Sequence, residues 1–380
     1  MKLGIITITD GANYGNRLQN YALQTVLQEL GLECETIKRS TSRDPSVIRK
    51  IGIRVKDILR IVLGRKTNQI YRIRRNRFEE YNKKHIVWSD YTLKKNTAPK
   101  GLQDYYQYFI CGSDQIWNVK FDVVKEDILN YLAFFARPEQ RVSYAASFGT
   151  SSIQDERYLK IFINELPKFK AISVREKAGI DLVNRFAGKK ASLVLDPTML
   201  LTADDWKKSE KKPDYMDSNS SYVVTYFMSG RNAMLDTYID SVKSSFGCSK
   251  VINLDMEFIE RYRIEDDNVF CTTPDEFLWL ISHASAVLTD SFHATVFALL
   301  FHKPFCVFER KAKESGNNMS SRVETLLSYF ELNRFKDDIS SPHIIPEAYD
   351  YEAIEGILQS KRSISLCFLK NALDIKDLFD

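Results

Sequence analysis

The sequence of 380 residues contains no apolar run of about 18 residues, which argues against a transmembrane helix. Cysteine and histidine are scarce, with six and five residues, and no Cys-x-x-Cys pair is present. We therefore expect no disulfide, no metal site and a reducing, cytoplasmic location. The opening segment "MKLGIITITD" turns polar too early for a secretory signal and is interpreted as a buried strand.

Several familiar motifs are also missing. We find no Gly-x-Gly-x-x-Gly dinucleotide fingerprint, no phosphate-binding Walker loop, no His-Glu-x-x-His zinc motif and no carboxylate pair at a persuasive spacing. Hydrophobic residues make up 44% of the chain and charged residues 27%, which is an ordinary globular composition. The length favours two domains with separate cores.

Positive charge is concentrated in one segment, residues 49–84, which holds thirteen Lys or Arg and three acidic residues. An apolar stripe flanked by cations over about Pro45 to Leu63 is typical of a helix that lies on an anionic membrane. Arg72, Arg74, Arg75 and Arg77 would extend that basic surface. The alternative is that the stripe packs on the first domain while the cations are solvated.

Short β-branched runs alternate with amphipathic segments along the chain, which predicts an α/β protein. The first unit is strand 3–8, a polar loop at 9–17, a helix that ends at Gly31 and a strand in "CETIKR". The pattern restarts after the polar stretch at 207–221. We predict two Rossmann-like, doubly wound domains facing across a cleft, 1–205 with a basic helical insertion at about 43–85, and 206–380, with C-terminal helices that pack back.

His293 is the first candidate for chemistry, because it follows the buried strand "SAVLTD" by three residues. We expect Asp290 or Ser291 to cap the next helix and His293 to stand exposed in its first turn. Ligands of open α/β sheets bind at such strand-to-helix junctions, where free N–H groups favour an anion. A histidine there can donate a proton to the ligand. The alternative is a histidine that is hydrogen-bonded in a core.

Arg175 in "ISVREKAG" occupies the same kind of junction in the first half of the chain. Its guanidinium could clamp a carboxylate or phosphate through paired hydrogen bonds. The alternative is a surface ion pair with the neighbouring Glu176.

Two polar loops offer further hydrogen-bonding groups, and both follow predicted strands. In "NYGNRLQN" glycine allows close backbone approach and amides surround it, whereas "GSDQIWN" combines a carboxylate, amides and an aromatic ring, a set suited to sugar hydroxyls. The alternative for the second loop is a turn with Trp117 in the core. The candidates are Asn13, Gly15, Asn16, Arg17, Gln19, Asp114, Gln115 and Asn118.

A further helix is predicted from "SSRVETLL", with Ser320 or Ser321 as its cap and Glu324 at the capping-box spacing from Ser321. Arg322 would then lie in the first turn. A cation is unfavourable there unless it faces an anion.

Together these motifs resemble, in order, those of the polysaccharide pyruvyl transferase family. The resemblance covers about residues 4–335, and seven motifs in one order are specific although each alone is weak. They are "NYGNRLQNYAL", "YFICGSDQIWN", "SYAASFG", "ISVREKAG", "LDPTMLL", the stretch 274–305 and "SSRVETLL".

The resemblance implies a fold like the two-domain GT-B glycosyltransferases and transfer of pyruvyl from phosphoenolpyruvate to a sugar as a cyclic ketal. It implies His293 as the general acid and Arg175 as a holder of the donor anion. Some members carry arginine at the position of Ser291 and many carry glycine at that of Ala294. Arg322, Arg310 or Lys303, with Ser291 and Ser321, would then bind the donor.

The family also implies the partners: phosphoenolpyruvate, and a glycan or polyprenyl-diphosphate-linked oligosaccharide as acceptor. No cofactor and no nucleic acid are expected. Two other functions stay open, a GT-B glycosyltransferase that uses a nucleotide sugar and a binding module without activity. We expect the protein in the cytoplasm, with a peripheral contact to the inner face of the membrane.

Overall fold

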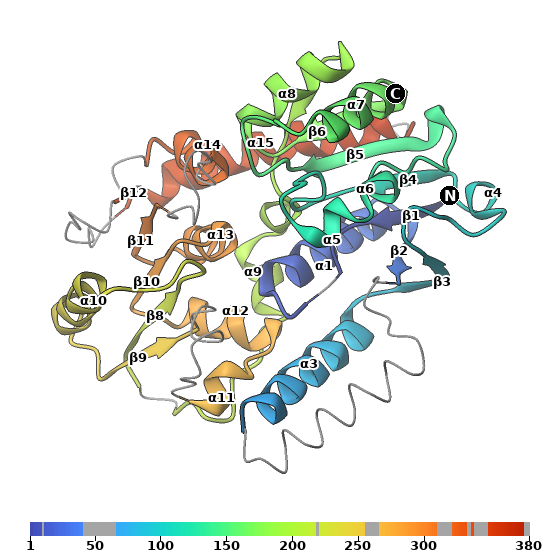
Figure 1. Cartoon of the computed structure of the whole chain (residues 1–380). Helices are drawn as coiled ribbons and strands as arrows, with labels where there is room; N and C mark the ends of the chain where they lie inside the picture. The colour runs from blue at the N-terminus through green and yellow to red at the C-terminus, as the bar shows by residue number, and fades with distance from the viewer. Residues whose placement is uncertain are drawn as a thin grey trace. The chain divides into compact units, whose positions relative to one another are not determined.

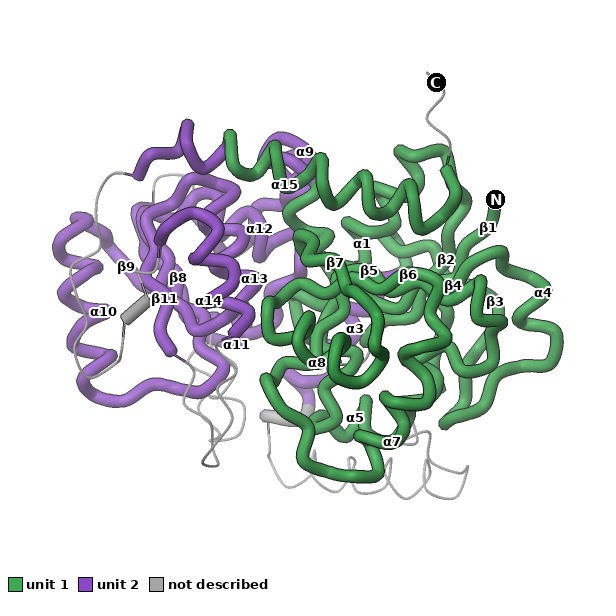
Figure 2. Tube along the Cα trace, turned by 90° about the horizontal axis from the view of Figure 1, so that it is seen from above, with its two compact units in different colours: residues 1–50, 83–200, 356–380 green, residues 51–82, 201–355 purple. Residues whose placement is uncertain are grey.

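A computed structural model describes most of the chain and divides it into two compact units (Figure 2). Unit 1 comprises 1–50, 83–200 and 356–380, and unit 2 comprises 51–82 and 201–355. Each unit holds one parallel sheet with helices around it (Figure 1). The described residues are 1–9, 11–40, 66–217, 220–254, 266–309, 321–332, 336–337 and 349–375.

Unit 1 is built on a seven-stranded parallel sheet in the order β3-β2-β1-β4-β5-β6-β7. The chain adds β2 and β3 on one side of β1 and the later strands on the other, so the direction of winding reverses between β1 and β4. The carboxyl ends of strands at such a reversal form the usual ligand crevice of an open α/β sheet. The strands are β1 (Lys2–Ile6), β2 (Glu33–Arg39), β3 (Trp88–Leu93), β4 (Tyr108–Cys111), β5 (Arg141–Ala146), β6 (Ala171–Val174) and β7 (Ser192–Leu193).

Local capping residues mark the ends of helix α1 in unit 1. Asn13 caps α1 by accepting a hydrogen bond from the Asn16 N–H at 3.2 Å, and Gly31, with a φ of 77°, follows its end. The helix therefore starts earlier than predicted and includes residues 14–17, the last part of the first polar loop. The helices are α1 (Tyr14–Glu29), α4 (Leu102–Tyr105), α5 (Asp122–Lys125), α6 (Ile128–Tyr131), α7 (Glu156–Glu165), α8 (Lys177–Ala187) and α15 (Tyr351–Ala372).

Unit 2 is built on a five-stranded parallel sheet in the order β12-β11-β10-β8-β9. Its winding reverses between β8 and β10, the two strands that carry the candidate loops of this unit. Apolar side chains of β8, β10 and β11 pack with helix α10 to form its core. The strands are β8 (Tyr222–Tyr226), β9 (Lys250–Asn253), β10 (Ala286–Thr289), β11 (Phe305–Phe308) and β12 (Lys336–Asp337).

Capping residues set the starts of several helices in unit 2. The clearest case is Thr273, which forms a reciprocal capping box with Glu276 ahead of Pro274 at the first helical position. The helices are α9 (Ala203–Lys207), α10 (Ala233–Ser245), α11 (Asp267–Phe270), α12 (Pro274–Ser282), α13 (Phe292–Leu300) and α14 (Ser321–Tyr329). Short 3-10 turns in unit 1 complete the description, at Pro138–Gln140, Leu166–Lys168 and Pro197–Met199.

The unit boundaries differ from the predicted domains in two respects. The first break falls after Leu200 rather than at 205, and residues 51–82 group with unit 2 rather than with the first domain. Residues 356–380 return to unit 1, in agreement with C-terminal helices that pack back. Two hydrogen bonds hold the C-terminal helix α15 against unit 1. In α15 the Ser365 hydroxyl accepts the Leu195 N–H at 3.0 Å and Arg362 Nε donates to the Met199 carbonyl at 2.8 Å.

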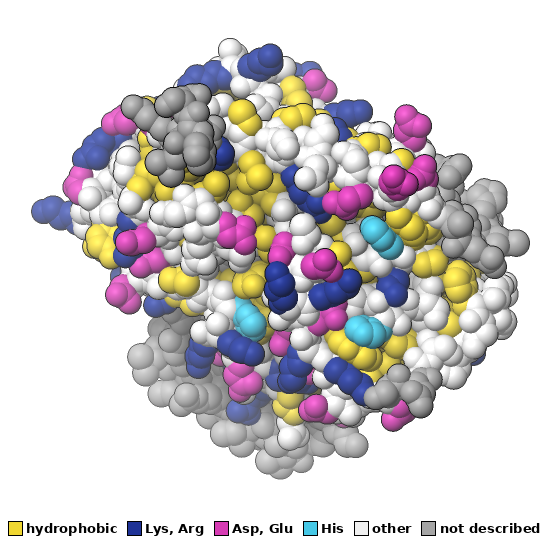
Figure 3. All heavy atoms as spheres, turned by 180° about the vertical axis from the view of Figure 1, so that it is seen from behind, with side chains coloured by type: hydrophobic (Ala, Val, Ile, Leu, Met, Phe, Trp, Pro, Cys, Tyr) yellow, Lys and Arg dark blue, Asp and Glu magenta, His cyan; other side chains and the backbone are white. Residues whose placement is uncertain are grey.

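The basic segment is described only from α3 (Lys66–His85) onward, and the predicted interfacial helix at about 45–63 lies outside the described residues. Two of the four arginines predicted to form a basic surface instead make contacts inside unit 2, to which residues 66–82 belong. Arg74 is buried and donates to the Phe270 carbonyl, and Arg77 pairs with the buried Glu276 at 2.6 Å. On the face drawn in Figure 3, basic side chains stand beside acidic ones.

None of the described helices is long and apolar enough to span a bilayer.

Candidate functional site

The junction of β10 and α13 in unit 2 carries the predicted catalytic residue. β10 ends at Thr289, Ser291 occupies the N-cap position, and His293 is the second residue of α13, as the sequence predicts. One expectation was wrong: His293 is only 7% exposed rather than standing free in solvent. Its ring lies edge-on to Phe292, with centroids 5.2 Å apart. The imidazole is thus held in a packed first turn.

Asp290 does not cap α13 but fixes the neighbouring loop. Its carboxylate accepts the backbone N–H groups of Met228 and Ser229 at 2.8 and 2.9 Å, and also the Ser229 hydroxyl. Because Met228 and Ser229 follow β8, this carboxylate ties together the two strand ends at the winding reversal of unit 2. The loop between β8 and α10 is therefore held beside the first turn of α13.

Ser291 has an unusual environment for an N-cap residue. Its side chain makes no capping hydrogen bond to α13, and within the described part of the chain no hydrogen bond from its hydroxyl is found, although the residue is buried. Its own N–H is bound by the Thr289 hydroxyl at 2.9 Å, which holds the turn in place. The first turn of α13 thus presents a hydroxyl and the positive end of the helix together.

The sequence analysis proposed Arg322, Arg310 and Lys303 as cations that bind the donor. Of these, the structure shows Arg322 near the first turn of α13. Arg322, buried in the first turn of α14, lies with its guanidinium carbon 6.0 Å from the centroid of the Phe292 ring. Lys303 follows the opposite end of α13, roughly 10 Å or more along the axis, where burial lowers its pKa. Arg310 lies outside the described residues.

Ser321, one of the two residues predicted as the cap, is the first residue of α14 as described. Its carbonyl accepts the Thr325 hydroxyl at 2.8 Å, and its own hydroxyl is buried. Because Ser320 lies outside the described residues, the predicted cap of this helix stays a prediction.

The sequence analysis did not include Arg231 among the candidate site residues. Arg231 follows Ser229 by two residues, in the loop that Asp290 fixes. Its Nε lies 3.2 Å from the Asp236 carboxylate in the first turn of α10, and its side chain is 12% exposed. The available signal was positional, since Arg231 follows a buried strand just as Arg175 and His293 do.

At the winding reversal of unit 1, a chain of hydrogen bonds joins the ends of β1 and β4. The Gln19 amide donates to the Thr7 hydroxyl at 2.9 Å and accepts the Ser113 N–H at 3.1 Å. Thr7 in turn donates to the Ser113 carbonyl at 3.0 Å. All three residues are buried, so Gln19 serves here to position the loop after β4.

Arg175 lies at the end of β6, buried between two carboxylates. Its Nη1 is 2.6 Å from Asp196 Oδ2, and its Nη2 is 2.9 Å from Asp114 Oδ1. Asp196 also accepts the Ser113 hydroxyl at 2.9 Å. The alternative of a surface ion pair between Arg175 and Glu176 does not hold, because both residues are buried. Glu176 Oε1 accepts the Ser147 hydroxyl at 2.9 Å.

This cluster has more negative than positive charge: Asp114, Asp196 and Glu176 surround one guanidinium. Two carboxylates already occupy the Nη groups that were predicted to clamp a donor anion. Asp114 adopts a φ of 72°, and its second oxygen makes no hydrogen bond within the described part of the chain. The edge of unit 1 thus presents an ordered carboxylate acceptor.

The remaining loop candidates mainly stabilise their own loops. Arg17 Nη2 donates to the carbonyls of Thr9 and Gly11 at 2.7 and 2.6 Å. Asn118 donates to the Gln115 side chain at 2.8 Å. A Cβ at Gly149 would lie 2.1 Å from the oxygen of that Gln115 amide, so glycine is required for this close packing. Asn13, Gly15 and Asn16 belong to the cap and first turn of α1.

Trp117 agrees with the structural alternative for its loop. It is fully buried, packs against Phe148 and donates from Nε1 to the Tyr131 carbonyl at 3.3 Å. The ring therefore packs in the core beneath the loop, and the polar residues beside it, Asp114, Gln115 and Asn118, are buried as well.

We expect Asp290→Ala to lower the free energy of unfolding by about 2–4 kcal/mol, because three donors in the β8–α10 loop lose a charged acceptor. Urea denaturation followed by tryptophan fluorescence measures this. Asp240→Ala, which removes an exposed carboxylate from α10, is the matched control. Equal stability of the two variants would show that the Asp290 contacts do not fix the loop.

Among the described residues, no group of three or more His, Cys, Asp or Glu side chains is placed to hold a metal ion.

Comparison with solved structures supports the α/β fold with two Rossmann-like units. A protein from Listeria monocytogenes assigned as a UDP-N-acetylglucosamine 2-epimerase matches with a TM-score of 0.52 at 9% identity, over 99% of this chain and 97% of that one. This likeness confirms a GT-B-like fold and nothing about activity.

Two other structures match with lower scores. The UDP-GlcNAc 2-epimerase of Methanocaldococcus jannaschii has a TM-score of 0.48 at 14% identity over 95% of this chain and 94% of its own. HepE from Anabaena, in complex with UDP and glucose, has a TM-score of 0.41 at 10% identity over 99% and 96%. No curated protein sequence matches the chain.

The family comparison rests on sequence and is more specific. The family model for polysaccharide pyruvyl transferase matches residues 13–311, a range that includes both strand-end sites and all the motifs up to β11. This chain belongs to the polysaccharide pyruvyl transferase family.

Proposed function

We propose that the protein transfers pyruvyl from phosphoenolpyruvate to a sugar of a cell-surface polysaccharide or of its lipid-linked precursor, forming a pyruvate ketal. The observation that carries the proposal is the first turn of α13, which combines His293, the Ser291 hydroxyl and a helix N-terminus, with Arg322 beside Phe292. Phosphoenolpyruvate is a small dianion or trianion, and such groups favour helix N-termini and arginine.

The reaction needs one proton donor of near-neutral pKa. Transfer of a proton to the methylene carbon of the donor produces a methyl group and an oxocarbenium-like carbon next to it. One sugar hydroxyl attacks that carbon and a second hydroxyl displaces phosphate. The two hydroxyls release two protons, of which one restores the acid and the other leaves with phosphate. In this proposal His293 donates the proton, and the Ser291 turn with Arg322 binds the donor anion.

On the acceptor side, we assign Asp114 as an acceptor of sugar hydroxyl hydrogens, with Gln115 and Asn118 beside it. This assignment rests on the ordered carboxylate that Arg175 holds from behind at 2.9 Å. Hydroxyl groups pair well with carboxylates whose position is already fixed, because little conformational entropy is lost on binding. We place the reaction in the cytoplasm, where phosphoenolpyruvate is available.

Phosphoenolpyruvate alone should stabilise the protein against heat. At a concentration 100 times Kd, a ligand that binds only the folded state adds about 2.7 kcal/mol, which is readily seen as a rise in Tm. A glycan extract incubated with protein and phosphoenolpyruvate should gain the mass of a pyruvyl ketal. Stabilisation by a UDP-sugar instead, with no mass gain from phosphoenolpyruvate, would support the glycosyltransferase alternative and refute the proposal.

A further inference from the structure

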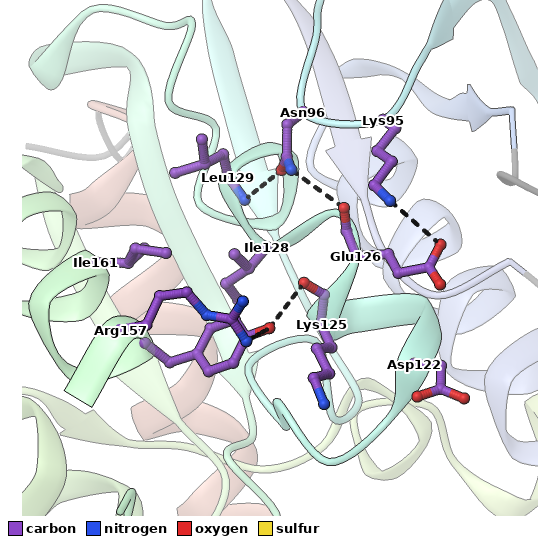
Figure 4. Close-up of a pocket in the computed structure, with 10 residues that line it drawn as sticks. Lys95, Asn96, Asp122, Lys125, Glu126, Ile128, Leu129, Arg157 and Ile161 are labelled. Atoms are coloured by element: carbon purple, nitrogen blue, oxygen red, sulfur yellow. Dashed lines mark hydrogen bonds and ion pairs between the residues drawn. The ribbon is translucent and has the colours of Figure 1, made fainter. Parts of the chain in front are cut away.

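A cavity of 480 Å³ lies in unit 1, apart from the strand-end residues described above. It is formed by the turn after β3, the α5–α6 segment and the start of α7 (Figure 4). Its volume is within the range of small-ligand pockets, and no motif of the sequence pointed to it. Its lining residues are Lys95, Asn96, Asp122, Lys125, Glu126, Ile128, Leu129, Arg157, Tyr158 and Ile161.

The walls of this cavity are held in place by hydrogen bonds. Asn96 donates from its amide to the Glu126 carbonyl at 3.1 Å and accepts the Leu129 N–H at 3.2 Å. The Tyr158 hydroxyl reaches the Lys125 carbonyl at 3.4 Å, which ties α7 to the end of α5. Figure 4 shows these contacts bridging the three segments. The cavity is therefore preformed, which reduces the entropic cost of binding.

The cavity combines an apolar floor with charges of both signs at its rim. Ile128, Leu129 and Ile161 supply the apolar surface. At the rim, Lys95 pairs loosely with Glu126 at 3.7 Å, whereas no ion pair is found for Asp122 or Lys125 within the described residues. Two groups at one rim, a cation and a carboxylate, are thus available to a ligand.

Arg157 adds a second, oriented cation. Its guanidinium carbon lies 4.5 Å above the centroid of the Tyr158 ring, and its Nη2 donates to the Tyr158 hydroxyl at 2.9 Å. Stacking on a buried ring restricts the guanidinium, although the side chain is 64% exposed and its Nη2 also lies 3.5 Å from the Asp155 carboxylate. No hydrogen bond from its Nη1 or Nε is found within the described residues. A planar fork of this kind matches a carboxylate or phosphate group.

We propose that this cavity binds a segment of the glycan that carries an anionic substituent, as a site separate from the reacting sugar. The apolar floor would cover the C–H face of a sugar ring, Asp122 would accept hydroxyl hydrogens, and Arg157 with Lys125 would bind the anion. A nucleotide base fits less well, because the face of Tyr158 is already covered by Arg157. The inference uses the family's polysaccharide substrates but does not depend on phosphoenolpyruvate as donor.

The test uses the full-length protein without phosphoenolpyruvate. Isothermal titration with a galacturonic acid trimer should give saturable binding, and a neutral galactose trimer should bind more weakly. Arg157→Gln with Lys125→Gln should weaken binding of the acidic trimer by about tenfold to hundredfold, since charge-assisted hydrogen bonds are lost. The matched control is Arg185→Gln with Lys160→Gln, which removes one exposed Arg and one exposed Lys outside the cavity.

Equal weakening by both pairs of substitutions would overturn the proposal, as would equal binding of acidic and neutral trimers or no binding of either. Flotation with anionic phospholipid vesicles that depends on Arg157 and Lys125, without binding of the acidic trimer, would assign the cavity to a lipid headgroup instead. Because no step of the test involves pyruvyl transfer, its failure leaves the proposed reaction untouched, and failure of that reaction leaves this test valid.

Discussion

His293→Ala is expected to lower the rate of pyruvyl transfer by about 10²- to 10⁴-fold, the usual contribution of a positioned general acid. The physical reason is that this side chain is held in the first turn of α13, next to the Ser291 hydroxyl and the positive end of the helix. Transfer measured by phosphate release at saturating donor isolates the chemical step. Donor affinity, measured by thermal shift, should change far less than the rate.

His293 is buried, so its loss could also disturb packing. His293→Gln, which keeps a polar side chain of similar reach, therefore accompanies the alanine variant, and both should lose turnover although their Tm values differ. The matched control is His283→Ala, whose half-exposed ring stacks on Trp279 at the end of α12. Full turnover in both His293 variants would show that the residue is structural and would refute the proposed acid.

Arg175→Ala is expected to lower the free energy of unfolding by about 3–5 kcal/mol, because it leaves two buried carboxylates without their shared cation. Asp114 and Asp196 would both remain near the carboxyl ends of the strands, each with an oxygen that has lost its guanidinium partner. Urea denaturation measures the loss. Arg185→Ala, which removes an exposed arginine from α8, should leave stability within about 0.5 kcal/mol of the original protein.

A second variant, Arg175→Lys, separates two roles for this arginine. If Arg175 binds the donor anion, as the family resemblance implies, Arg175→Lys should weaken the thermal shift given by phosphoenolpyruvate. If Arg175 instead positions Asp114, the shift should persist, while the Michaelis constant for the acceptor rises. Unchanged stability of Arg175→Ala together with a lost donor shift would contradict the positioning role drawn from the ion pairs.

Much of the site was predictable because it depends on local sequence. The strand "SAVLTD" and the helix after it follow from apolar pattern and turn residues, so the place of His293 in a first turn could be inferred without coordinates. The same holds for Arg175 at the end of β6 and for the two-unit α/β fold. Seven motifs in order were enough to predict the family that the family model then confirmed.

Side-chain partners were not predictable, because they come from distant parts of the chain. Asp290 looked like a helix cap, yet it binds Met228 and Ser229, about sixty residues earlier. Arg175 looked like a free clamp, yet Asp114 and Asp196 neutralise it. A short motif specifies which side chains lie at the end of one strand. The order of strands in the sheet decides which other strand ends, with their side chains, are its neighbours.

By itself, the sequence determined the alternation of strands and helices, the ends of most of them, and the residue types at each strand-to-helix junction, since these depend on side-chain periodicity and capping within a few residues. Only the tertiary structure decided that residues 51–82 group with unit 2, that Arg175 lies between Asp114 and Asp196, and that one cavity joins α5, α6 and α7. The physical reason is that burial and ion pairing depend on contacts between segments far apart in the chain, which periodicity does not encode.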